Sequence, residues 1–138
     1  MRLHSITVQD YRGIAQQKID FHNHGITVIA GPNQSGKSSV IEAINLVLTE
    51  KATSRKEAVK AIRRSGVDRP AIVELDVTIG GERFTLRKEF GRGRQAGTTL
   101  VFADGSKEAL WGDPAHNYVQ ELLAEHEDMA LFLSLIHI

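Results

Sequence analysis

Apolar and polar residues alternate along two segments in the middle of the chain, a pattern typical of strands with one buried face. The clearest alternation covers residues 73–79, and the following Gly80-Gly81 pair suits a two-residue hairpin turn. Alternation returns at 83–87, and residues 98–102 form a third candidate strand before a turn at Asp104-Gly105. These segments predict an antiparallel meander.

The N-terminal third predicts strands followed by an amphipathic helix. Ile6 and Val8 alternate with polar residues, a second short strand is expected at 18–21, and the β-branched run 26–30 is typical of a buried strand. A helix is predicted to start near Lys37, because one apolar stripe recurs at helical spacing in Val40, Ile41, Ile44, Val47 and Leu48. Further helices are predicted at 52–64 and from Asp113 onward.

Composition fits one soluble domain, for which we expect a cytoplasmic location. The 138 residues include no cysteine, which excludes disulfides and thiolate metal sites, and the six histidines form no metal-binding pattern. The most apolar stretch, 129–138, is about half of a membrane crossing, so no membrane association is expected. The 17 basic and 17 acidic residues are unevenly distributed: a basic segment, 51–69, holds seven basic and two acidic residues, and an acidic segment, 104–128, holds seven acidic residues and one basic residue. The basic segment fits either a nucleic-acid contact or a solvated helix face.

The most specific motif is Gly31-Pro32-Asn33-Gln34-Ser35-Gly36-Lys37-Ser38, which fits the phosphate-binding pattern G-x-x-x-x-G-K-[ST] at every fixed position. Glycines let the backbone N–H groups curl around a phosphate, and the helix that follows adds its positive N-terminal dipole. Lys37 can reach the phosphates as a point charge, and the Ser38 hydroxyl can ligate Mg²⁺. The motif lies between a predicted strand and a predicted helix, as this chemistry requires, so it predicts nucleotide binding.

The residues that hydrolysis needs are not evident. Phosphoryl transfer also requires an acidic residue for the metal and a residue that positions water. The nearest candidate is 72–76, where Glu74 interrupts the apolar run, so a half-exposed strand explains this segment better.

The motif, extended by Ser39, resembles the ATPase heads of SMC, SbcC, RecF and RecN proteins. The segments 3–14 and 62–66 and the strand 71–79 are also similar to those heads. The resemblance implies an α/β P-loop NTPase fold, in which an ABC-type head lobe has a mixed sheet plus an antiparallel meander. It also implies ATP and Mg²⁺ as ligands, with Ser38 on the metal. By position it assigns nucleotide contacts to Arg12, Asn33, Gln34, Ser35, Gly36, Lys37, Ser38 and Ser39.

Such heads act on DNA in break repair or recombination. Two heads sandwich ATP, a coiled coil follows the N-terminal half, and some members work with an SbcD-type nuclease. The glutamine loop, signature motif and catalytic acidic residue of the family all follow the segment seen here. We therefore expect residues 1–132 to be an incomplete N-terminal lobe that is inactive alone. Residues 133–138 match what a sequencing adaptor encodes and are expected to be a foreign tail.

Other assignments share the same motif. An ATP-gated clamp that organises chromosomes would differ in its coiled coil and hinge, and an overcoming-lysogenization-type nuclease would carry an acidic metal site after its head. A small P-loop kinase would need an arginine-rich lid, which residues 87–94 imitate poorly. A transporter's ATPase subunit fits less well, because the turn Tyr11-Arg12-Gly13 favours the DNA-acting branch.

Overall fold

The computed structural model describes residues 1–21, 34–63 and 68–126, and for 34–38 it describes the backbone alone. Six strands form one sheet in the order β2-β1-β3-β4-β5-β6, and every described pair of neighbours is antiparallel. The strands are β1 (Arg2–Tyr11), β2 (Ile14–Asp20), β3 (Ala71–Ile79), β4 (Glu82–Phe90), β5 (Gly97–Phe102) and β6 (Leu110–Trp111). The predicted meander is confirmed, whereas the predicted strand at 26–30 lies outside the described residues.

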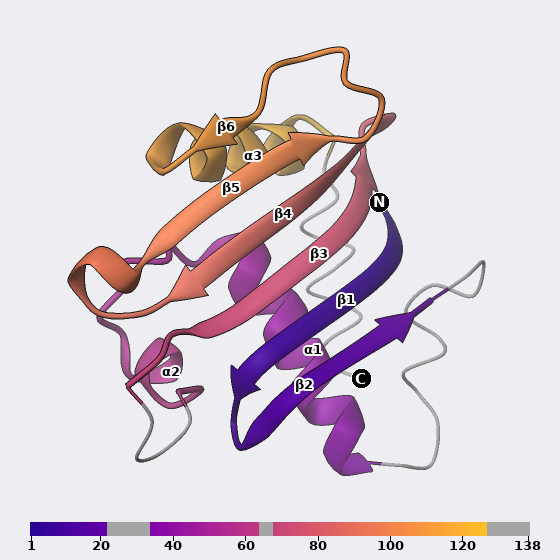
Figure 1. Ribbon diagram of the computed structural model, residues 1–138. Coiled ribbons are helices and arrows are strands. Elements are labelled where there is room, and N and C mark those ends of the chain that lie inside the picture. Colours follow the sequence, from indigo (N-terminus) through magenta and orange to yellow (C-terminus); the bar gives the residue numbers. More distant parts are fainter. Residues whose placement is uncertain (22–33, 64–67, 127–138) are drawn as a thin grey trace.

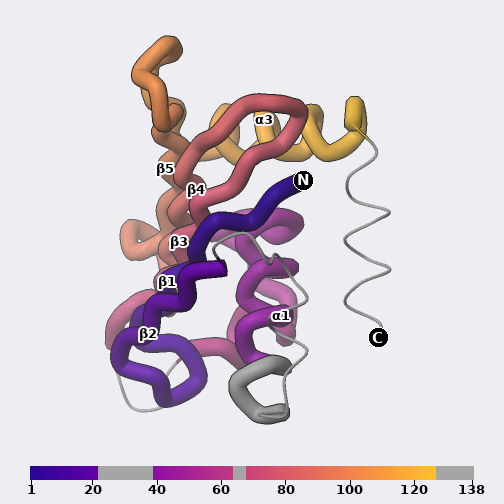
Figure 2. The backbone as a smooth tube through the Cα atoms, turned by 90° about the vertical axis from the view of Figure 1, so that its right-hand side faces the viewer, coloured from indigo at the N-terminus to yellow at the C-terminus, as the bar shows by residue number. Residues whose placement is uncertain are grey.

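Helices α1 (Gln34–Thr49) and α3 (Asp113–Glu125) lie on the same face of the sheet (Figures 1 and 2). The sheet presents alternate residues to them, so that all five odd-numbered positions of β3 are buried. The even-numbered positions of β3 point to the opposite face. The core therefore lies between the sheet and the helices, as a single layered unit.

The hairpin between β3 and β4 turns at Gly80-Gly81, where φ is +61° and +82°. Both values lie in the left-handed region that glycine adopts without steric cost, which confirms the predicted two-residue turn. A Cβ at Gly80 would lie 2.2 Å from Nε2 of the exposed His126 ring, which would have to turn away.

Two predicted helix boundaries are corrected. Helix α1 begins at Gln34, three residues before the expected start, so its first turn lies within the glycine-lysine-serine motif. The predicted helix at 52–64 shrinks to α2 (Glu57–Lys60). Beyond it the backbone pairs with the first hairpin instead of continuing the helix: Ile62 accepts a hydrogen bond from Arg12 N at 2.8 Å, and Arg63 bridges to Tyr11.

Candidate phosphate-binding site

Helix α1 carries the predicted phosphate-binding residues. Gly31, Pro32 and Asn33 lie outside the described residues, while Gln34, Ser35, Gly36, Lys37 and Ser38 form its first turns and Ser39 follows. The first N–H groups of a helix have no intrahelical partner, and their dipoles attract anions. The first turn of α1 contains no acidic residue that would oppose a phosphate. The backbone of this segment therefore suits the predicted chemistry.

The buried face of α1 fixes the helix against the sheet. Val40, Ala43, Ile44, Val47 and Leu48 of this face are all buried. Their spacing confirms the stripe predicted from the sequence, with Ile41 only partly buried at its margin.

A buried lysine secures the other end of α1. Lys88 of β4 is fully buried, and its Nζ donates a hydrogen bond to the Glu50 carbonyl oxygen at 2.7 Å. The same Nζ lies 2.9 Å from Nδ1 of His116, and Gln120 of α3 donates to the Leu48 carbonyl at 2.6 Å. Burial lowers the Lys88 pKa to about 7. These contacts satisfy carbonyl groups that a helix end leaves unpaired, so α1 is held to both β4 and α3.

Arg12 reaches the same helix from the turn between β1 and β2. Its Nε donates to Oε1 of Glu42 at 2.7 Å, and its Nη2 donates to Oε2 at 2.9 Å. The Tyr11 hydroxyl donates to the same Oε1 at 2.5 Å. Burial raises the Tyr11 pKa, and the hydrogen bond to Glu42 raises it further, while that carboxylate also raises the Arg12 pKa. Arg12 therefore lies beside the helix that bears the phosphate motif.

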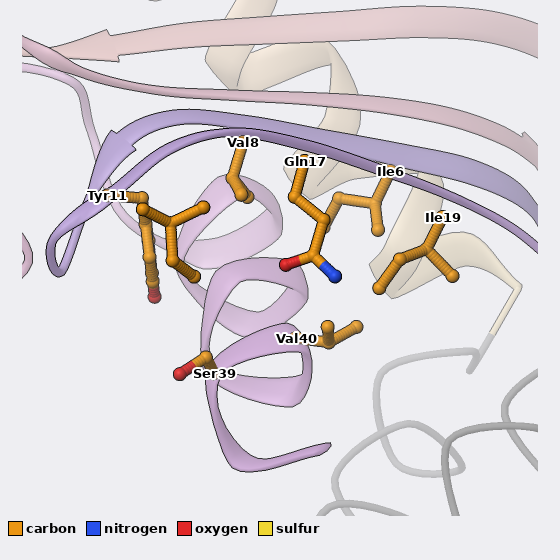
Figure 3. Close-up of a pocket in the computed structure, with 8 residues that line it drawn as sticks. Ile6, Val8, Tyr11, Gln17, Ile19, Ser39 and Val40 are labelled. Carbon is orange, nitrogen blue, oxygen red and sulfur yellow. The ribbon is translucent and has the colours of Figure 1, made fainter. Parts of the chain in front are cut away.

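An apolar pocket separates the first hairpin from the N-terminal half of α1. Figure 3 shows side chains of β1, β2 and α1 that line it, with Ser39 and Val40 on the helix side. The other lining residues are Ile6, Val8, Tyr11, Ile14, Gln17 and Ile19. Among the predicted site residues with described side chains, only Ser39 lines this pocket. Tyr11 lines the pocket from the side of the first hairpin.

The acidic residues of β3 lie on the wrong face for a role at α1. Glu74 pairs with Arg87 at 3.2 Å and Asp76 with Arg83 at 2.9 Å, on the face opposite the buried Val73 and Leu75. This confirms that 72–76 is a half-exposed strand. No group of acidic or histidine side chains that could hold a metal ion occurs among the described residues.

Most of the described lysines and arginines in the basic segment already have acidic neighbours. The pairs are Lys51–Asp113 at 3.7 Å, Lys56–Glu50 at 3.0 Å, Lys60–Glu57 at 4.0 Å and Arg69–Asp10 at 3.3 Å. Such pairing favours a solvated helix face over a nucleic-acid contact for this segment. A nucleic-acid contact would need cations that are free to pair with phosphates.

Sequence reasoning missed Glu42. It lies four residues after Ser38, and residues at that spacing share a helix face. An acidic residue at this point, within an otherwise apolar stretch of the helix, was the available signal. Its partner could not be inferred, because Arg12 is thirty residues away in the chain.

The fold is compatible with that of a P-loop ATPase. Helices cover one face of an antiparallel sheet, and α1 begins inside the glycine-lysine-serine motif. Residues 5–125 match the family model described as AAA domain, so the chain belongs to this family, and its relatives make it SMC/RecF/Rad50-like.

Three relatives illustrate the similarity. An uncharacterized protein of Mycobacterium tuberculosis H37Rv is 37% identical over 132 residues, which is 96% of this chain and 15% of that protein. The DNA double-strand break repair Rad50 ATPase of Archaeoglobus fulgidus is 31% identical over 107 residues, or 75% of this chain and 12% of the relative. The DNA replication and repair protein RecF of Magnetococcus marinus is 39% identical over 66 residues, or 48% and 17%. The chain thus spans less than a fifth of the length of each relative.

Proposed function

We propose that this chain binds ATP-Mg²⁺ as the N-terminal part of an SMC/SbcC-like ATPase. One observation carries the proposal: α1 begins within the motif, and the buried apolar stripe of α1 holds this helix against the sheet. Asn33, Gln34, Ser35, Gly36 and Lys37 would wrap the phosphates through backbone N–H groups and the lysine ammonium. Ser38 would hold the metal, Ser39 would complete the cradle, and Arg12 would supply a further cation. Mg²⁺ would neutralise charge on the phosphate oxygens.

The proposal assigns hydrolysis to the longer protein rather than to this segment. Phosphoryl transfer needs an acidic residue near the metal, and the described acidic residues of β3 face away from α1. We propose that the complete ATPase pairs two heads around ATP, as a homodimer, with a coiled coil between the halves of each head.

We further propose DNA as the partner of the complete protein, in double-strand break repair or recombination. The names of two relatives, a double-strand break repair ATPase and a replication and repair protein, support this choice. An SbcD-type nuclease is the corresponding protein partner, and the cytoplasm is the proposed location. None of the described helices has the length and apolar character needed to span a membrane.

Thermal unfolding with and without ATP-Mg²⁺ tests the proposal. A ligand at one hundred times its Kd stabilises the native state by about 2.7 kcal/mol, which for a chain of this size raises Tm by roughly 8 °C. Lys37→Ala should abolish this shift, because it removes the cation that reaches the phosphates. Lys60→Ala, which removes an exposed lysine paired at 4.0 Å with Glu57, is the matched control and should keep it. An equal shift in wild type and Lys37→Ala would refute the assigned site.

A further inference from the structure

We propose that Glu42 is a positioning residue for the phosphate site. Its carboxylate holds the Arg12 guanidinium side-on beside the first turns of α1, so that the free edge of that guanidinium can receive a phosphate oxygen of the nucleotide. The inference rests on the proposed function, because it assumes that the motif binds a nucleotide.

The geometry of the pair leaves donors available. Glu42 accepts hydrogen bonds from Nε and Nη2 of Arg12, which is one side of the planar guanidinium. A guanidinium has five N–H donors in a fixed fork, and the two at Nη1 have no carboxylate partner in the described part of the chain. Side-on pairing therefore fixes the plane of the group and leaves its end for a second anion.

The helix register places this pair beside the motif. Ser38 and Ser39 precede Glu42 by four and three residues, so the three positions share one face of α1. Helical side chains tilt toward the N-terminus, so the Glu42 carboxylate lies over the turn that bears the two serines. Four residues correspond to about 6 Å of helix, a span that an arginine side chain can bridge. Ser39 and Tyr11 also line the same pocket (Figure 3).

The turn that carries Arg12 is firmly held. Arg12 and Gly13 form a two-residue hairpin turn between the paired Tyr11 and Ile14, and their φ angles of 46° and 82° are those that such a turn requires. Two contacts hold the turn: Arg12 N donates to the Ile62 carbonyl at 2.8 Å, and Arg69 pairs with Asp10 at 3.3 Å. Between them the Tyr11 side chain is fully buried. The turn therefore holds Arg12 beside α1, within reach of Glu42.

Stability alone is a weak reason for the pair. The side chains of Arg12 and Glu42 are 41% and 32% exposed. Most ion pairs this exposed contribute about 1 kcal/mol or less to folding, because water screens the attraction, although a bidentate pair such as this one can contribute more. The Tyr11 hydroxyl, which bonds the same carboxylate oxygen, instead restricts the direction of Glu42. A pair whose direction is fixed by three hydrogen bonds fits a positioning role.

The decisive experiment measures the Kd for ATP-Mg²⁺ by titration calorimetry in wild type, Arg12→Ala, Glu42→Ala and the double variant. Loss of a charge-assisted hydrogen bond to phosphate corresponds to roughly tenfold weaker binding. We therefore expect the Kd of each single variant to be about ten times that of wild type. The double variant should lose no more than Arg12→Ala alone, because Glu42 acts only through Arg12. Glu42→Gln keeps one acceptor oxygen in nearly the same shape, so it should fall between wild type and Glu42→Ala.

Asp76→Ala is the matched control. Asp76 holds Arg83 in the same side-on geometry, at 3.1 Å from Nε and 2.9 Å from Nη2, but on the face of the sheet away from α1. Its removal should leave the Kd unchanged. Urea unfolding of each variant without nucleotide separates loss of binding from loss of fold.

Three results would overturn the inference while wild type still binds ATP-Mg²⁺: an unchanged Kd in Glu42→Ala, tighter binding in Glu42→Ala, or losses that add in the double variant. Tighter binding would mean that the carboxylate merely repels the phosphates. If wild type itself gives no binding heat, the proposed function fails, and the positioning role fails with it.

Discussion

The buried Lys88 should make the wild-type chain more stable as pH rises from 7 to 9, and replacing it with methionine should remove this rise. Burial lowers the pKa of Lys88 to about 7 in the native state, whereas a lysine in an unfolded chain titrates near pH 10.4. Between these values the unfolded state binds more protons than the native state. The free energy of unfolding therefore increases with pH in this window.

The magnitude follows from the difference in bound protons. One proton corresponds to about 1.4 kcal/mol per pH unit, and the native lysine is still half protonated near pH 7. Integration from pH 7 to pH 9 gives a rise of about 2 kcal/mol. The charged and titratable groups around Lys88 and its partner His116 are Glu50 and Lys51 after α1 and Asp113 on α3. Tyr11, whose pKa is raised by burial, stays protonated in both states over this range.

The assay is urea unfolding of wild type and Lys88→Met at several pH values in this window. The slope with pH is the measured quantity, because Lys88→Met also leaves the Glu50 carbonyl and His116 without their partner and so changes the absolute stability. Lys60→Met, at an exposed position, should keep the wild-type slope. Parallel pH profiles for wild type and Lys88→Met would refute the assigned origin of the rise.

Two further predictions concern turns and acid stability. Gly80→Ala and Gly81→Ala should each destabilise the chain by about 1 kcal/mol, because both positions have positive φ, while the exposed His126 ring that a Cβ would meet at Gly80 can turn away; an unchanged urea transition in both variants would contradict the left-handed turn. Burial and the nearby Lys88 charge lower the His116 pKa to about 4, so stability should fall as pH drops from about 6.5 toward 4. His116→Phe should flatten this acid limb, and an unchanged acid limb would argue against this origin.

The sequence predicts elements well where local periodicity coincides with packing. Alternation at 73–79 identified β3 because each odd-numbered residue contacts the core, and Gly80-Gly81 identified the turn because few residues tolerate its φ angles. Lys88 occupies a buried position of the same alternation in β4, between Leu86 and Phe90. A lysine is rarely buried, so the sequence alone predicts an exposed side chain here. The burial depends on the Glu50 carbonyl and the His116 imidazole, which are distant in the chain.

The errors arise where distant contacts decide the local structure. The polar segment 52–64 has few residues for the core, and its end pairs with the first hairpin, so α2 stops at Lys60. Strand β6 has two residues, too few for a periodic pattern. In the site, the motif itself was evident from spacing, whereas the Arg12–Glu42 pair depends on strand and helix meeting in space.

Binding of ATP-Mg²⁺ by the wild-type chain, compared with Lys37→Ala in equilibrium dialysis, tests the central claim most directly. The account predicts saturable binding of one nucleotide per chain that depends on Mg²⁺ and is lost in Lys37→Ala, whose fold is checked by its unfolding transition without nucleotide. Absence of binding by the folded wild-type chain, or equal binding by the variant, would contradict the assignment of this segment as a nucleotide site.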